Sequence, residues 1–196
     1  MKSQSISPKY LINMGVFSAI YLTVLLTVGM ISTFGPIFML VGWVLCILIN
    51  GVVVMLYLKR TPITGTFTAL GLFVGGLYVI MGSFWFVIIG MVILGILCDA
   101  IVWFGSPESN KNKIFAYGVF SMWYINALFP IFFNSENYFK EIARYTNNQA
   151  YADQMQQIFT PASIVVIAIV LFVVGCIGGW LGTNILSKHF VKAGIA

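Results

Sequence analysis

The sequence predicts an all-α membrane protein with six transmembrane helices and both termini in the cytoplasm. Charged residues make up 8% of the 196 residues, against roughly 25% in an ordinary soluble domain, and the mean hydropathy is +1.00. The apolar residues gather in runs long enough to cross the ~30 Å hydrocarbon core of a bilayer as helices. The ten Lys and Arg residues lie mostly at the ends of these runs. That distribution is typical of membrane orientation and argues against a nucleic-acid-binding face or a soluble domain.

The first predicted span, residues 10–30, contains no charge and would be about 30 Å long as a helix. Gly15 and Ala19 stand four residues apart near its start, so they share one helix face and form a shallow groove where another helix can approach closely. Lys2 and Lys9 precede the span, which puts this groove in the cytoplasmic half. Other pairs of small residues are expected only to let helices pack closely: Gly71/Gly75, Gly175/Gly179 and Gly178/Gly182.

The next three predicted spans are residues 37–58, 64–81 and 84–104. The second span ends at Lys59 and Arg60, and Pro62 then prevents the helix from continuing. Gly82 and Ser83 form the turn between the third and fourth spans.

The last two predicted spans are residues 114–133 and 161–186. The polar loop 105–113 precedes the fifth span, and Pro161 opens the sixth as a favoured first helical residue. Between these two spans lies the longest polar stretch of the chain, residues 134–160.

Counting basic residues predicts the orientation. With six spans the two termini share a side, and eight of the ten basic residues fall on it: Lys2, Lys9, Lys59, Arg60, Lys111, Lys113, Lys188 and Lys192. The other side holds Lys140 and Arg144. The positive-inside rule therefore places the termini in the cytoplasm and residues 134–160 outside the cell.

Residues 134–160 carry apolar side chains at helical spacing, in the two sets Tyr138, Ile142, Tyr145 and Tyr151, Met155, Ile158. The spacing predicts a short extracellular amphipathic helix. One interpretation is a helix resting on the membrane interface, where tyrosines are common. The other is a lid over an outward-facing pocket. The spacing alone favours the first.

Nothing in the sequence indicates an enzyme, a metal site or a bound cofactor. His189 is the single histidine, which leaves a metal site or a Ser-His triad on the outer face without one. The cysteines Cys46, Cys98 and Cys176 are far apart in apolar stretches. Asp99, the one acid inside a span, is expected to be hydrated near the interface or to pair with a lysine. Without a nucleotide-binding loop, the chain alone cannot drive active transport.

Five segments together resemble one known family: LINMGVFSAIYLTV, ILCDAI, AYGVFSMWYINALFPIFF (116–133), AYADQM (150–155) and KHFVKAGIA. This is the Trep_Strep family, whose members look like substrate-binding S components of energy-coupling-factor (ECF) transporters. The resemblance covers nearly the whole chain, and the order of the segments agrees.

The resemblance implies a six-helix protein of the bacterial plasma membrane that binds a vitamin or another scarce small molecule near its outer surface. Loops between the first and second, third and fourth, and fifth and sixth helices would close over the cavity. The partners would be a membrane coupling subunit and two cytoplasmic ATPases. The small-xxx-small motif of the first helix is the docking surface in such proteins, and Gly15 and Ala19 match it. The resemblance also favours the lid interpretation of residues 134–160.

Ligand contacts are then expected at the outer ends of the spans: Phe34, Phe38, Met81, Phe84, Trp85, Trp123, Tyr124, Asn126, Phe129, Tyr138, Arg144, Tyr145 and Tyr151. The alternative for each is an interfacial aromatic belt. Trp123 and Asn126 are the strongest candidates because they lie inside a span. The aromatic bias favours a flat, largely apolar ligand, such as haem with a tyrosine or methionine as axial ligand, or a vitamin with a conjugated ring. Arg144 or Lys140 would meet a carboxylate.

Two functions from other classes stay open. A stand-alone channel or facilitator would move its solute without ATP. A non-transport membrane subunit, acting as a scaffold or chaperone for partner helices, would bind a partner tightly and no small molecule.

Overall fold

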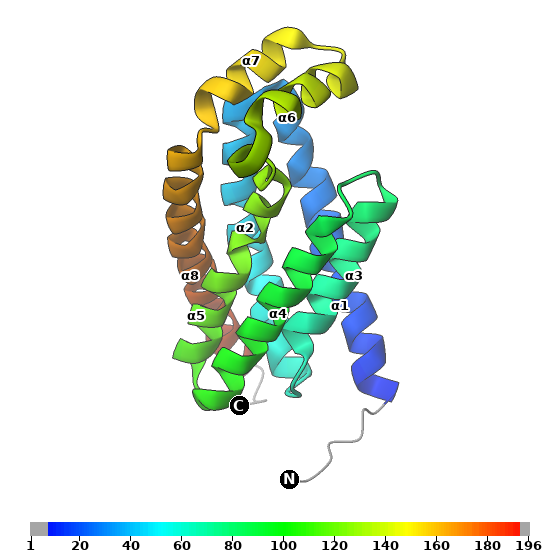
Figure 1. Ribbon diagram of the computed structural model, residues 1–196. Coiled ribbons are helices and arrows are strands. Elements are labelled where there is room, and N and C mark those ends of the chain that lie inside the picture. Colours follow the sequence, from blue (N-terminus) through cyan, green and yellow to red (C-terminus); the bar gives the residue numbers. More distant parts are fainter. Residues whose placement is uncertain (1–7, 193–196) are drawn as a thin grey trace.

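The described chain, residues 8–192, consists of helices joined by short turns in the computed structural model (Figure 1). The helices are α1 (Pro8–Gly29), η1 (Met30–Phe34), α2 (Pro36–Arg60), α3 (Thr66–Ile80), α4 (Phe86–Phe104), α5 (Asn110–Phe120), η2 (Ser121–Leu128), α6 (Ile131–Thr146), α7 (Gln149–Ile158) and α8 (Pro161–Lys192). The symbol η marks 3₁₀ helices. The described residues contain no strand, which confirms the prediction of an all-helical protein.

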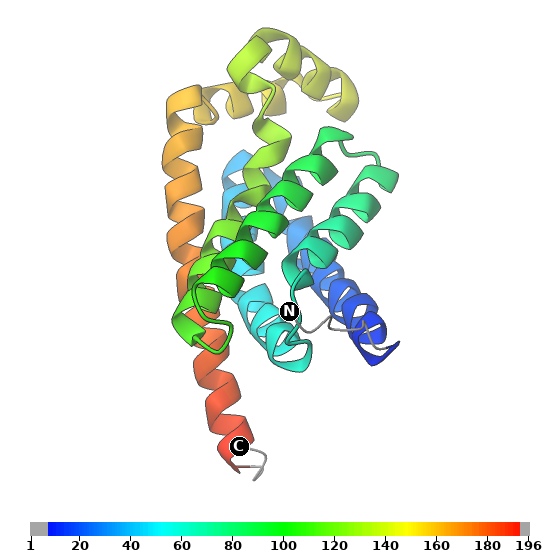
Figure 2. The same ribbon diagram turned by 60° about the horizontal axis from the view of Figure 1, so that its bottom comes forward.

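The long helices form a bundle with two different ends (Figures 1 and 2). Helix α2 packs on α8, α8 on α5, and the α3–α4 hairpin on α1 and α5. Helices α6 and α7 lie across one end, which we call the α6–α7 end. The opposite end, where α2 turns into α3 and α4 into α5, carries most of the described basic residues: Lys9, Lys59, Arg60, Lys111, Lys113 and Lys188. We call it the basic end.

Glycines bring the helix backbones of the bundle into direct contact. A Cβ atom at Gly182 would lie 2.7 Å from the carbonyl oxygen of Gly51, and one at Gly178 would lie 2.9 Å from that of Ile47. A Cβ atom at Gly71 would lie 2.6 Å from the carbonyl oxygen of Met91. No real side chain fits at these distances, so α2–α8 and α3–α4 pack as closely as the glycine spacing predicted.

Four helical segments are long and apolar enough to cross a membrane: Pro8–Phe34, Pro36–Arg60, Phe86–Phe104 and Pro161–Lys188. Helix α3 has 15 residues and a length of about 22 Å, less than the ~30 Å core. It is shorter than the predicted span 64–81 because left-handed glycines at both ends, Gly65 (φ 93°) and Gly82 (φ 96°), belong to turns. By length and composition, residues 8–192 therefore contain four clear candidate spans, and the six-span topology stays a prediction.

The sequence predicted the fifth span, residues 114–133, as one uninterrupted helix, and this is wrong because the segment is not a single regular helix. Helix α5 begins earlier, at Asn110, and the chain tightens into the 3₁₀ helix η2 before a 58° bend towards α6. Pro130 explains the break, because it has no N–H to continue the helical hydrogen bonds. Phe129 N–H donates to the carbonyl of Asn126 at 3.2 Å, a 3₁₀ bond. If the bent pair counts as one span, the protein has up to five by length and composition.

The predicted single amphipathic helix is two helices. Helix α6 is kinked at Asn134 (φ −154°, ψ 75°), the first residue of the predicted extracellular stretch. It ends at Asn147, whose left-handed backbone (φ 50°) reverses the chain, and the Asn148 side chain then caps α7 by accepting from Tyr151 N–H at 3.0 Å. Tyr138 is buried in the predicted stripe, whereas Tyr145 is 82% exposed. The stripe is incomplete because the apolar contacts of α6 concentrate near its start.

Candidate functional site

The 3₁₀ helix η2 carries two neighbouring aromatic residues into the interior of the bundle. Trp123 is 3% exposed and Tyr124 is 5% exposed, and their rings stack with centroids 4.3 Å apart. A 3₁₀ segment inside a longer helix often marks a functional or strained region. The local geometry thus presents two large aromatic faces at one point of the core.

Three more aromatic side chains, from α1, α2 and α3, surround this pair. Trp123 Nε1–H donates to Tyr21 Oη at 2.9 Å. The Tyr78 ring meets Trp123 edge-on at 5.4 Å between centroids, and Trp43 lies 5.6 Å from Tyr124. We call these five residues the aromatic cluster. Such geometry suits a flat ring, which gains both stacking and edge contacts.

Two buried polar atoms at the cluster have no hydrogen-bond partner among the described residues: Tyr124 Oη and Asn126 Nδ2. The Tyr124 hydroxyl lies close to the Tyr21 hydroxyl and the Cys46 thiol, which are weak polar partners without well-aligned hydrogen-bond geometry. Leaving a buried polar group unpaired costs about 1–3 kcal/mol, so most such groups in proteins are satisfied. An Asn amide group and a Tyr hydroxyl can both donate. These atoms are therefore suited to acceptor atoms of a small molecule.

Gly90 of α4 makes the room that Asn126 occupies. A Cβ atom at Gly90 would lie 2.5 Å from Asn126 Nδ2, a distance that no side chain tolerates. Any larger residue at position 90 would displace the Asn126 amide from this position. The position of Asn126 is thus built by two elements, α4 and η2.

The α6–α7 pair covers this end of the bundle. Phe159, just after α7, lies 6.2 Å from Trp43, and Tyr138 of α6 lies 6.4 Å from Phe84 in the α3–α4 turn. Tyr145 Oη is 3.9 Å from the position of a Cβ on Gly82. The pair has its own apolar core, formed by Leu128, Ile131, Tyr138, Phe139, Met155, Phe159 and Ile164. It therefore packs on the aromatic cluster as a partly separate unit.

Among the predicted ligand contacts, Trp123 and Tyr124 of η2 and Tyr138 of α6 are buried, and Asn126 of η2 is half-buried. Phe84 and Tyr151 are half-buried. The others are exposed: Phe34, Phe38, Met81, Trp85, Phe129, Arg144 and Tyr145. Their exposure fits the alternative of an interfacial aromatic belt.

The sequence reasoning missed Tyr21, Trp43, Tyr78 and Gly90. One available signal was Tyr21, because a tyrosine hydroxyl in the middle of an apolar span needs a polar partner. That partner, Trp123, is 102 residues away, and no local pattern connects the two.

The charged residues of α6 lie on the surface. Lys140 Nζ donates to Glu136 Oε1 at 2.6 Å, and this contact lowers the pKa of the Glu136 carboxyl. The two side chains are 70% and 78% exposed. Burial raises the pKa of the Tyr151 hydroxyl on α7 above its usual value. Arg144 is exposed as well. A ligand carboxylate at Lys140 or Arg144 would therefore bind at the protein surface.

Gly15 and Ala19 lie on an exposed face of α1. No atom comes within 4 Å of a Cβ at Gly15. In contrast, a neighbouring helix already occupies the space beside each glycine of the α2–α8 and α3–α4 contacts. The predicted docking groove is therefore open in the described chain. The described residues also contain no group of three or more His, Cys, Asp or Glu that could hold a metal ion.

Residues 9–192 match a family described as hypothetical bacterial integral membrane proteins, Trep_Strep. The chain belongs to the Trep_Strep family. No curated protein and no solved structure matches it. The family description and the apolar helices together make this Trep_Strep protein a multi-pass protein of a bacterial membrane. Its predicted role in transport goes beyond this description.

Proposed function

We propose that this Trep_Strep protein is the substrate-binding S component of an ECF-type ABC importer. It captures a small molecule at the α6–α7 end, which faces outward, and delivers it inward with a membrane coupling subunit and two cytoplasmic ATPases. The chain crosses the membrane six times, with α3 and the bent α5–η2 segment as the two irregular spans and the basic end in the cytoplasm.

The proposal is carried by one observation: within the described chain, η2 holds two buried polar atoms without a well-aligned hydrogen bond, Tyr124 Oη in the aromatic cluster and Asn126 Nδ2 two residues along. Small-molecule sites combine aromatic walls with a few polar groups that fix orientation. The cluster has both, and two helices cover it. A ligand that moves these packed rings apart and stacks on them would accept the hydrogen bonds that Tyr124 and Asn126 do not form within the described chain.

The substrate is a planar, conjugated molecule, vitamin-like or a tetrapyrrole such as haem. Stacking on Trp123 and Tyr124 supplies apolar contact, and acceptor atoms on the ring receive hydrogen bonds from Tyr124 and Asn126. The cluster has no charged member. Any carboxylate of the substrate therefore extends towards the surface, where Lys140 and Arg144 lie.

The open groove at Gly15 and Ala19 is the surface for the coupling subunit. Close approach of two helices in lipid requires small residues, because van der Waals packing replaces the hydrophobic driving force there. Every other glycine contact described above serves packing within the bundle. The α1 groove is the one suited to a second chain.

The test begins with protein purified from its native host in mild detergent. Native mass spectrometry and an absorbance spectrum should reveal a bound conjugated compound, and Asn126→Ala should lose it. Trp180→Ala is the matched control, since Trp180 is 55% exposed on α8. Uptake into liposomes should require the coupling subunit, the ATPases and ATP.

Two results would contradict the proposal in different ways. Solute uptake by the purified chain alone, without ATP, would identify a stand-alone facilitator. Tight binding of a membrane partner with no small-molecule ligand would identify a scaffold subunit.

A further inference from the structure

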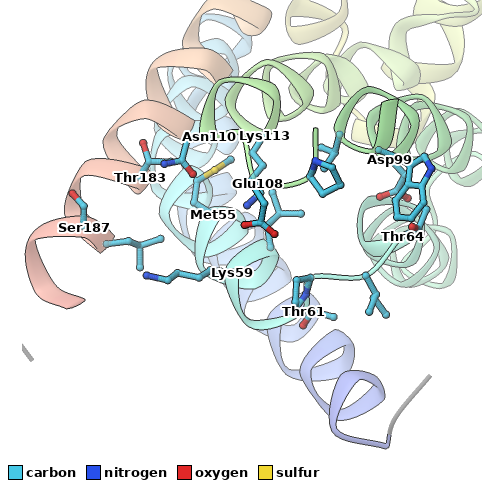
Figure 3. A pocket seen from close by; sticks show the side chains of 17 residues that line it. Met55, Lys59, Thr61, Thr64, Asp99, Glu108, Asn110, Lys113, Thr183 and Ser187 are labelled. Carbon is cyan, nitrogen blue, oxygen red and sulfur yellow. The ribbon is translucent and has the colours of Figure 1, made fainter. Parts of the chain in front are cut away.

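A cavity lies at the basic end of the bundle (Figure 3), and none of its lining residues belongs to the aromatic cluster. Its volume is about 640 Å³, within the range of small-molecule sites. It lies between the ends of α2, α4 and α8, the start of α5, and the turns that join them. The lining is mixed: apolar side chains such as Met55, Leu58 and Val102 alternate with lysine, hydroxyl and amide groups.

Asp99 lines this cavity, but its carboxylate is already hydrogen-bonded within the protein. Its carboxylate accepts hydrogen bonds from Phe67 N–H at 3.0 Å, Thr68 N–H at 2.9 Å and Thr68 Oγ1–H at 2.6 Å. These are the free donors at the N-terminus of α3, whose positive end also balances the carboxylate charge. Asp99 is therefore a helix cap supplied by a neighbouring helix, and it offers little to a ligand.

Among the charged side chains that line the cavity, Lys113 is the one best suited to an anion. Lys113, in the first turn of α5, reaches the cavity and forms no ion pair with another described residue. Lys59 lines the opposite wall. The α5 N-terminus contributes its positive dipole end beside Asn110. Glu108 opposes these charges from the α4–α5 loop.

Thr61, at the edge of the cavity, has a buried hydroxyl without a partner in the described chain. It lines the cavity, is 1% exposed, and its Oγ1 has no hydrogen-bond partner among the described residues. A buried hydroxyl is normally paired. A phosphate oxygen is a suitable acceptor for the ammonium group of Lys113.

We propose that the basic-end cavity binds a phosphate group, supplied either by an anionic phospholipid headgroup or by a soluble phosphate. Basic pockets between transmembrane helices are suited to anionic lipid headgroups. The cavity lies at the ends of spanning helices, and Trp103, which lines it, is 52% exposed, as expected at the lipid–water interface. The site is independent of the proposed importer function, because it uses no residue of the aromatic cluster.

The experiment uses the full chain in phosphatidylcholine nanodiscs with a minor fraction of phosphatidylglycerol, and native mass spectrometry counts the retained phosphatidylglycerol. Wild type should retain it, and Lys113→Gln should bind it about fivefold more weakly, the contribution of one lysine near an anionic headgroup. Lys111→Gln is the matched control. It removes the same charge from the same turn of α5 but does not line the cavity. Glu108→Gln should bind more tightly than wild type.

A parallel arm separates the two sources of phosphate. If millimolar inorganic phosphate raises the unfolding midpoint of wild type but not of Lys113→Gln, and displaces the lipid, the ligand is a soluble phosphate. If only phosphatidylglycerol binds, the ligand is the lipid headgroup. Equal binding of phosphatidylglycerol by the Lys111→Gln and Lys113→Gln variants would overturn the proposal. Retention of an acidic peptide in place of phosphatidylglycerol would overturn it as well. If Lys113→Gln unfolds at a lower temperature than wild type in pure phosphatidylcholine, its weaker binding could reflect lost stability, and Glu108→Gln becomes the deciding variant. If Glu108→Gln then binds phosphatidylglycerol with the same affinity as wild type, the proposed site is rejected.

Discussion

Tyr117 and Tyr124 lie seven residues apart on one continuous segment, yet their hydroxyl groups differ in hydrogen bonding. Tyr117 Oη donates to the carbonyl of Ile47 at 2.6 Å, which ties α5 to α2. Tyr124 Oη is also buried, but it forms no well-aligned hydrogen bond within the described chain, and its polar neighbours are the Tyr21 hydroxyl and the Cys46 thiol. A hydroxyl kept at such a cost fits a role in binding rather than in folding.

The two tyrosines therefore give a matched test. Tyr117→Phe should lower the free energy of unfolding by about 1 kcal/mol, because it removes a buried hydrogen bond. Tyr124→Phe should leave the ligand-free stability unchanged or raise it, because it removes an unsatisfied group, and should weaken binding of the co-purified ligand. Thermal unfolding in detergent, with and without that ligand, measures both effects. Equal destabilisation by the two substitutions would contradict a binding role for Tyr124.

Asp99 shows how a residue can be structural for an unpredicted reason. The sequence led us to expect hydration or a lysine partner. Instead the carboxylate, 8% exposed, caps the start of α3 from α4. A backbone N–H leaves no mark in the sequence, so this pairing depends on the tertiary fold.

Asp99→Ala should destabilise the protein by about 1–3 kcal/mol, because it leaves buried N–H groups of Phe67 and Thr68 unpaired. Ligand binding at the other end of the molecule should persist at temperatures where the variant is folded. The unfolding midpoint and ligand retention are the two measurements. Asp153→Ala, at an exposed position of α7, is the control and should have little effect. A stable Asp99→Ala variant that loses the ligand would instead link Asp99 to binding.

At the scale of the helices, glycines serve two purposes that the sequence alone does not distinguish. At Gly178 and Gly182 of α8, the α2 backbone occupies the space where a side chain would lie. Gly15 of α1 faces open space, with exposed Leu11 and Val16 nearby. The small-xxx-small pattern is the same in both helices, and only the arrangement of the bundle shows which one is free.

Gly15→Leu should therefore fold normally, retain ligand affinity and lose the coupling to the transmembrane partner. Gly178→Leu should fail to fold or lose several kcal/mol, because the side chain would overlap the α2 backbone. Co-purification with the coupling subunit, ligand binding and unfolding temperature separate the two. Loss of both ligand binding and coupling in Gly15→Leu, or of neither, would contradict the docking role of the α1 groove.

The irregular fifth span illustrates the limit of reading helices from a pattern. The 3₁₀ segment η2 and an α-helix have similar apolar spacing over one or two turns, so hydropathy did not separate them. Pro130 was the local signal for the bend, and Asn134 correctly marked the change from apolar to polar chain. The step from η2 to α6 is where the deepest residues of the candidate site and the helices above it are connected.

For the whole molecule, the sequence predicts what depends on local chemistry and misses what depends on distant contacts. Long apolar runs predicted the helices, and prolines and glycines predicted most of their ends. Trp123 and Asn126 could be selected because an amide and an indole inside a span are unusual. Tyr21, Trp43 and Tyr78 could not, because each looks like an ordinary apolar-span residue until the packing of α1, α2 and α3 brings it to Trp123 and Tyr124.

Topology is the remaining property of the whole molecule, and it depends on α3. Single cysteines at the exposed positions Met81, Asn110 and Gln149 test it in a background without Cys46, Cys98 and Cys176. If α3 crosses the membrane, a membrane-impermeant maleimide should label Met81→Cys and Gln149→Cys in intact cells, because both lie at the outer end. Asn110→Cys should react only after permeabilisation, because the basic end faces the cytoplasm. Labelling of Asn110→Cys in intact cells would reverse the orientation. If Met81→Cys is labelled only after permeabilisation while Gln149→Cys is labelled in intact cells, α3 does not cross the membrane. The protein would then have five spans or fewer, and the six-span importer model would be wrong.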